Sequence, residues 1–100
     1  MNLGRVVGTV VSTIKAPGLH SYKLLLVSPL DAQLTDNPTV DSDIYVAVDL
    51  IGAGEGEVVL VCRGSAARVV ADTSDVPTDA AIIAVIDTIQ LGTSTAYSKS

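Results

Sequence analysis

The most suggestive chemistry in this chain lies in a glycine-rich stretch near its middle. Gly52, Gly54 and Gly56 alternate in the run IGAGEGE, and closely spaced glycines can bring backbone N–H groups against a phosphate. A phosphate cradle must follow a strand and open a helix, because the helix N-terminus supplies the N–H donors and the positive dipole. Here the glycines lead into Val58 to Cys62 (VVLVC), which predicts a strand, and no Gly-Lys-Ser/Thr follows. The pattern therefore argues against a nucleotide site.

The other chemically capable residues do not form a catalytic set. His20 is the only histidine and lies in a Pro-Gly loop, and Cys62 is the only cysteine and lies in an apolar run. Nucleophilic catalysis needs an activated nucleophile with a base beside it, and a zinc site needs about four ligands. The paired acids are expected to be solvated loop charges; these are Asp41 with Asp43 and Glu55 with Glu57. We therefore predict no enzyme, no metal and no cofactor.

Composition narrows the class of protein further. Eleven acidic residues stand against six basic ones, which opposes the basic surface that nucleic-acid binding requires. One cysteine excludes an internal disulfide and favours the reducing cytoplasm. Met1 leads directly into a strand pattern without the order of a signal peptide, and the longest apolar run, Ala80 to Ile86, is too short to span a bilayer. We expect a soluble cytoplasmic protein that binds neither nucleic acid nor membrane.

The elements that must position these residues are short strands. Alternating Val, Thr and Ile indicate strand rather than helix, and the expected strands are Leu3–Ile14, Lys23–Val27, Ile44–Asp49, Glu57–Arg63 and a last one within 80–91. Gly4 and Gly8 inside the first strand indicate a bend or a close approach by another backbone. We predict an all-β protein, one domain over residues 1–100, folded as a small OB-like five-stranded β-barrel.

Three connecting segments complete this prediction. Residues 28–42 are predicted to form an exposed hairpin or loop, GSAARVV one short helical turn, and the tail from Gly92 a loose segment or one tied down by a neighbour. Aliphatic residues are abundant for so short a chain, at 48% hydrophobic with three aromatics. Because small domains rarely leave large apolar patches exposed, we expect burial against another copy.

The chain resembles the EutN/CcmL family of bacterial microcompartment vertex proteins. The resemblance rests on GRVVGTVVSTIKAPGL and KLLLV near the start, VAVDLIGAGEGEVVLVCRGSAAR in the middle, and PTDAAIIAVIDTI near the end, in this order and spacing. RGSAAR, IDTI and the closing AYSK are more similar to the carboxysomal branch than to the ethanolamine branch. The sequence departs from the family in a longer, more acidic stretch at Ala32–Ile44 and in Val58, where relatives often carry an aromatic residue.

The resemblance implies an OB-like barrel that forms a cyclic homopentamer at the five-fold corners of a polyhedral protein shell. Carboxysomal members enclose RuBisCO and carbonic anhydrase, alongside hexameric shell proteins and the scaffold protein CcmM. It implies no catalysis. A vertex protein of a catabolic microcompartment is the alternative, and an OB-fold module that binds nucleic acid or a ligand is an alternative of another class.

A ring of five copies suggests roles for the small and charged residues. Equivalent backbones crowd together near a rotation axis, so we predict that Gly52, Ala53 and Gly54 border the central opening; an ordinary turn is the alternative. We also predict a subunit interface in which an arginine pairs with an acid of the next copy. Its residues are Arg63, Ser65 and Arg68 on one side and Asp49 or Glu57 on the other, and a pair within one chain is the alternative.

Overall fold

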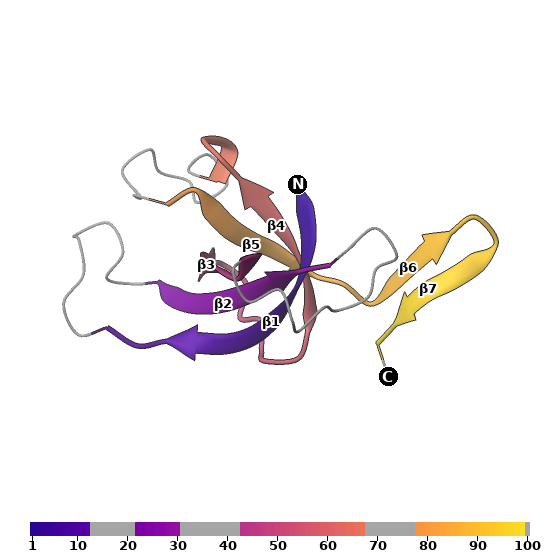
Figure 1. Cartoon of the computed structure of the whole chain (residues 1–100), viewed down its shortest axis with the longest axis horizontal. Helices are drawn as coiled ribbons and strands as arrows, with labels where there is room; N and C mark the ends of the chain where they lie inside the picture. Colours follow the sequence, from indigo (N-terminus) through magenta and orange to yellow (C-terminus); the bar gives the residue numbers. More distant parts are fainter. Residues whose placement is uncertain (13–21, 31–42, 68–77, 100) are drawn as a thin grey trace.

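The computed structural model of the protein describes residues 1–12, 22–30, 43–67 and 78–99. Within these residues the chain forms seven strands, namely β1 (Asn2–Val10), β2 (Lys23–Pro29), β3 (Tyr45–Asp49), β4 (Val58–Arg63), β5 (Ala80–Val85), β6 (Thr88–Leu91) and β7 (Ser94–Ser98). The first five close a barrel in the order β1-β2-β3-β5-β4, and β6 and β7 form a separate hairpin that projects from it (Figure 1). The predicted all-β fold with a five-stranded barrel is confirmed.

Antiparallel pairing dominates the barrel, with one parallel contact. β2 pairs with β1 and β3, and β4 pairs with β5 and closes the barrel on β1. β3 and β5 run parallel, with Val48 opposite Ala81. The chain between them therefore has to cross over, and β4 is part of that connection.

The barrel interior is filled by small aliphatic side chains. Alternation sends Leu25 and Val27 of β2 inward, where both are fully buried, and leaves Leu24 and Leu26 partly exposed on the outer face. The core cluster consists of Val6, Leu25, Val27, Ala47, Ala53, Val59, Val61, Ala80 and Ile82, with Tyr45 and Val85 packed against it. Burying each Leu, Val or Ile contributes about 1.5–3 kcal/mol, so this cluster is the main source of stability.

The glycines of β1 lie where the neighbouring strand approaches closely, and the approach is tighter at Gly4 than at Gly8. A Cβ on Gly4 would collide with the side chain of Val27 and lie 3.1 Å from the carbonyl oxygen of Ser28. A Cβ on Gly8 would lie 3.3 Å from Cδ1 of Leu26, and the β1–β2 register shifts between Val6 and Gly8. A bulge of this kind bends a strand, which helps a five-stranded sheet to close.

Two predicted strands differ from the structure at their ends. β1 stops at Val10, so Val11 and Ser12 lie outside it, and the rest of the predicted strand lies outside the described residues. The predicted strand at 80–91 is two strands, because the barrel pairing ends where Ile86 N–H donates to the Val58 carbonyl and the chain turns at Asp87. Of the two alternatives for the tail from Gly92, a loose segment is wrong for β7, which begins two residues later, and contact with a neighbour stays a prediction.

The predicted connections are described only in part. Ser28 and Pro29 belong to β2, and Ser28 is buried, so the predicted exposed segment begins later; residues 31–42 lie outside the described residues. The predicted helical turn is present at residues 66–67, where Ala67 N–H donates to the Gly64 carbonyl at 3.1 Å, but residues 68–77 are not described. His20 and Asp41 also lie outside the described residues.

Candidate functional site in the glycine loop

The glycine loop, residues 50–57, joins β3 to β4, and its N-terminal half is held by Asp49, the last residue of β3. Oδ1 of Asp49 accepts hydrogen bonds from the backbone N–H groups of Ile51, Gly52 and Ala53, at 3.1, 3.1 and 3.2 Å. The Asp49 side chain is 1% exposed. Aspartate at the end of a strand commonly bonds the backbone a few residues ahead and so fixes a turn.

Glu57 holds the same loop from its other side. Its Oε1 accepts the Gly54 N–H at 2.6 Å, and its Oε2 pairs with Lys99 Nζ at 2.5 Å. The hydrogen bond from Lys99, and then the N–H of Gly54, lower the pKa of Glu57, and the same pairing raises the pKa of Lys99. The four consecutive N–H groups of residues 51–54 are thus all bonded to two carboxylates of the same chain.

This arrangement is an anion-binding nest that is already occupied. Successive backbone N–H groups form concavities that bind anions, and here the anions are carboxylates from the two ends of the loop. Lys23 Nζ adds a third contact, because it donates to the Ala53 carbonyl at 3.3 Å and lies 4.0 Å from Oδ2 of Asp49. The loop is therefore fixed without a bound ligand.

The small residues of the loop are small for different reasons. Gly52 and Gly56 have φ angles of 83° and 90°, which side chains other than glycine rarely adopt, and a Cβ on either would meet nothing within 4 Å in the protomer. Ala53 is 1% exposed and belongs to the core cluster, so its side chain packs inside its own barrel. Whether Gly52, Ala53 and Gly54 also border an axis remains a prediction.

Arg63 lies at the far end of β4 from the glycine loop. Its guanidinium carbon is 4.0 Å from the centroid of the Tyr45 ring, a cation–π stack. Burial raises the pKa of Tyr45, and the positive charge of Arg63 opposes that rise. Arg63 Nε and the Tyr45 hydroxyl are both buried, and neither has a hydrogen-bond partner among the described residues.

The structure separates the residues predicted to form the subunit interface. Asp49 and Glu57 meet at the glycine loop, where their described partners are Lys23 and Lys99 rather than Arg63. Ser65 is exposed beside the helical turn. Arg68 lies outside the described residues. The predicted pairing of an arginine with Asp49 or Glu57 is thus not seen within the chain for Arg63.

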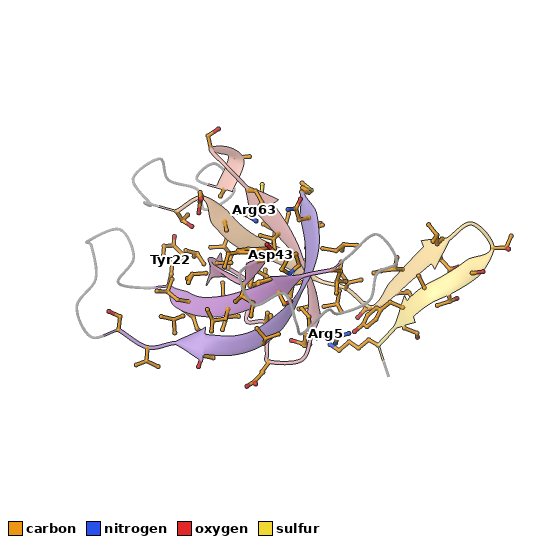
Figure 2. All side chains as sticks on the ribbon, viewed as in Figure 1. Arg5, Tyr22, Asp43 and Arg63 are labelled. Atoms are coloured by element: carbon orange, nitrogen blue, oxygen red, sulfur yellow. The ribbon has the colours of Figure 1, made fainter. Side chains whose placement is uncertain are left out.

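A shallow cleft of about 320 Å³ separates the glycine loop from the hairpin. It is lined by Arg5, Gly56, Glu57, Tyr97, Ser98 and Lys99. Arg5 Nη1 donates to the Gly56 carbonyl at 2.6 Å, and its guanidinium carbon lies 5.9 Å from the centroid of the Tyr97 ring. Figure 2 shows Arg5 on the side of the barrel that faces the hairpin. The cleft is bridged by contacts between its own walls.

The sequence analysis missed the three cations that organise this region. Lys23 is placed by the β2–β3 register, in which it stands opposite Asp49. Lys99 is 42 residues from Glu57, and Arg5 is 51 residues from Gly56, so no local pattern links them. Only Lys23 had a signal available in the sequence, because it opens one predicted strand and Asp49 closes the next, and antiparallel pairing of two such strands would bring the two residues together.

Other kinds of site are not found in the part of the chain that the structure describes. Over those residues no three His, Cys, Asp or Glu side chains come together as metal ligands. No helix among them has the length and apolar character needed to cross a bilayer. Cys62 is a free, buried thiol.

The fold and the loop define a small closed β-barrel protein built around a turn that bonds to its own carboxylates. A family model described as "Ethanolamine utilisation protein EutN/carboxysome" matches residues 1–87. The chain therefore belongs to the EutN/CcmL family, as its sequence resemblance indicates.

Individual relatives match over nearly the whole chain. The carboxysome shell vertex protein CcmL of Synechocystis sp. is 46% identical over 99% of this chain and 95% of its own length. The solved structure of Gloeobacter violaceus CcmL superposes with a TM-score of 0.88 at 43% identity, covering 99% of this chain and 98% of the other. The GrpN pentameric microcompartment shell protein from Rhodospirillum rubrum gives a TM-score of 0.77 at 42% identity, covering 91% and 99%.

Proposed function

We propose that this chain forms cyclic homopentamers that cap the vertices of a bacterial microcompartment shell, and that the shell is a carboxysome. The observation that carries the proposal is the near-full-length similarity to a carboxysome shell vertex protein. The chain acts as a structural protein and not as an enzyme. Its partners are four further copies of itself, the hexameric shell proteins around it and the scaffold protein CcmM, in the shell of a compartment within the cytoplasm.

The proposed role is geometric. A flat layer of hexagons cannot close, and replacing one hexagon by a pentagon turns the layer into a cone. A ring of identical copies uses a heterologous interface, in which one patch of a copy meets a different patch of the next, and it closes when the rotations sum to a full turn. Contacts from the five edges to hexamers would be weak one by one and strong together.

Features of the protomer support assembly with further copies. Several large apolar side chains remain exposed in the described residues, including Val7 at 38%, Val46 at 45% and Leu91 at 63%. Isolated apolar residues on a surface are ordinary, but clusters of them usually mark a contact with another molecule. These exposed apolar side chains are therefore available for contacts with further copies of the chain.

Light scattering coupled to gel filtration tests the pentamer. The expected mass is five times the 10.2 kDa of one chain. A stable monomer, or a ring of another count, refutes the proposed vertex. For the type of compartment, the chain is co-expressed with hexameric shell proteins of a carboxysome or of a catabolic compartment. Closure of the catabolic shell alone would favour the alternative.

The proposal that Gly52, Ala53 and Gly54 border the five-fold axis has a matched pair of variants. Gly52→Ala and Gly56→Ala introduce the same methyl at similar positive φ angles of 83° and 90°, and neither methyl meets an atom within 4 Å in the protomer. The strain in the protomer is therefore alike, about 1–2 kcal/mol. A methyl near the axis would be repeated five times in a crowded space, so only Gly52→Ala should weaken the ring. Equal pentamer stability in the two variants would place the axis elsewhere.

The proposed arginine contact between subunits now favours Glu57 as the acceptor. Both carboxylates already have partners within the chain, but the Glu57 side chain is 24% exposed, whereas that of Asp49 is 1% exposed. Arg68→Ala and Glu57→Gln should each weaken the pentamer, and the double variant should be no weaker than the worse single one. Strictly additive losses would show that the two residues do not interact.

A further inference from the structure

The C-terminal hairpin has an apolar face that its own barrel covers only in part. Residues 88–98 (TIQLGTSTAYS) contain no charged side chain. Ile89 and Leu91 alternate onto one face of β6, and Tyr97 of β7 stands opposite Ile89. Tyr97 faces Arg5 of the barrel, while Leu91 is 63% exposed at the distal end. The apolar face of the hairpin is thus in contact with the barrel at Tyr97 and exposed at Leu91.

The described contacts between the hairpin and the barrel lie near the base of the hairpin. The Lys99 N–H donates to the Asp87 carbonyl at 2.7 Å and closes the hairpin, while the Lys99 ammonium pairs with Glu57 and the Tyr97 ring lies against Arg5. A two-stranded hairpin is at best marginally stable in water, and exposed strand edges are usually protected by charged side chains. This hairpin has neither a covering layer over Leu91 nor a charge. The family model also ends at residue 87, just before β6.

A second apolar surface lies on the outer face of β1, β2 and β3, which we call the outer apolar face. Gly8, Leu26 and Val46 stand side by side across the three strands, and the next row consists of Val10, Leu24 and the buried Val48. Val46 is 45% exposed. Gly8, at the other end of this row, has no side chain, so the surface is depressed there. In Figure 1 the hairpin projects from one side of the barrel, and the ends of β1 and β2 extend toward the opposite side.

We propose that the hairpin is an arm that packs its Leu91 face onto the outer apolar face of the next copy of this chain. The inference rests on the proposed homopentamer. Both surfaces are apolar and uncharged, so neither has to desolvate a charge when they meet. They lie on different sides of one protomer, as a head-to-tail contact requires, and such a contact closes into a ring when the rotation closes.

Engineered cysteines test the contact directly. The double variant Leu91→Cys/Val46→Cys places one thiol on each surface, and the matched control Gln90→Cys/Val46→Cys moves the first thiol to the opposite face of the hairpin. Cys62 is buried, so the unchanged chain serves as the blank. After mild oxidation or treatment with a short bis-maleimide, a denaturing gel should show a ladder up to five chains for the Leu91 pair. The control should stay mainly as single chains.

The outcomes separate this inference from the proposed function. A pentameric mass with no ladder, or with equal ladders for the two pairs, overturns the arm and leaves the vertex proposal standing. Dimers from Leu91→Cys alone would mean that hairpins meet each other, which also overturns it. A monomeric unchanged chain removes both proposals.

A second pair of variants measures the strength of the contact. Leu91→Asp should raise the protomer concentration at which rings dissociate by roughly tenfold, from the leucine surface lost at each contact. Gln90→Asp should leave that concentration unchanged within about twofold, because a surface substitution away from a contact has little effect. Equal dissociation of the two variants would refute the arm.

Discussion

Asp49 should be the polar residue on which the glycine loop depends most. Asp49→Ala removes the acceptor of three N–H bonds, of which the one to Ala53 is fully buried and the ones to Ile51 and Gly52 are part-buried. Leaving one buried donor unsatisfied costs about 1–3 kcal/mol, whereas water can replace the acceptor at the more exposed positions. We expect a loss of about 2–3 kcal/mol, seen as a fall in Tm of roughly 8–20 °C at fixed protein concentration.

Asp49→Asn separates the hydrogen bonds from the charge. The amide oxygen can still accept the same three bonds, and only the charge and its 4.0 Å approach to the largely exposed Lys23 are lost. This variant should lose only about 1 kcal/mol, because Lys23 is 55% exposed and water screens its attraction to the buried Asp49 carboxylate. Glu55→Ala is the control, since Glu55 is an exposed acid of the same loop. The reasoning fails if Asp49→Ala unfolds like the control, or if Asp49→Asn is as damaging as Asp49→Ala.

Three further predictions concern the core, the hairpin and the arginine stack. Ile82→Ala should lower the free energy of unfolding by about 2–5 kcal/mol, because the fully buried Ile82 leaves a cavity, and a loss below that range in urea unfolding would contradict the described core. Glu57 has a lowered pKa, so its contribution is complete above the ordinary value of 4.5 and is lost as the pH falls through the lower folded value. Lys99→Met should raise that pKa toward 4.5, and an unchanged carboxyl titration by NMR would refute the pairing. Arg63→Met should raise the pKa of Tyr45 further, because the charge of Arg63 opposes the effect of burial; tyrosine absorbance at alkaline pH measures it, and a fall would refute the stack.

The barrel could be predicted because its strands carry their own signal. Period-two alternation in β1, the short apolar run of β2 and the turn glycines between β3 and β4 are local features, and the structure keeps them nearly in place. The break between β5 and β6 at Asp87 was missed because β-branched residues continue on both sides of it. Periodicity alone therefore predicts one continuous strand across the turn. Gly92 was the available signal for the hairpin. Its φ of 65° suits a two-residue turn between alternating strands.

The sequence identified the two carboxylates of the glycine loop but not the lysines that pair with them. Asp49 and Glu57 were selected as charges beside a glycine run and were predicted to meet an arginine, of the next subunit or of the same chain; within the described residues their partners are Lys23 and Lys99. The bonds of Asp49 to its own loop are local and follow from an aspartate placed just before a glycine turn. The contacts of Lys23 and Lys99 depend on strand register and on the path of the hairpin, which no short pattern encodes.

The glycine run resembles a phosphate cradle because in both, glycines let successive backbone N–H groups converge on a negative charge. In a cradle, glycines let successive N–H groups converge on an anion that arrives from solution, and the loop is ordered by that ligand. Here the converging N–H groups of residues 51–54 are satisfied by carboxylates from the chain itself. The loop therefore has its final shape before any partner arrives, so five copies can meet without first ordering it. Those N–H groups are also no longer free to bind a passing anion, so an opening bordered by this loop would select solutes by its width and by other atoms.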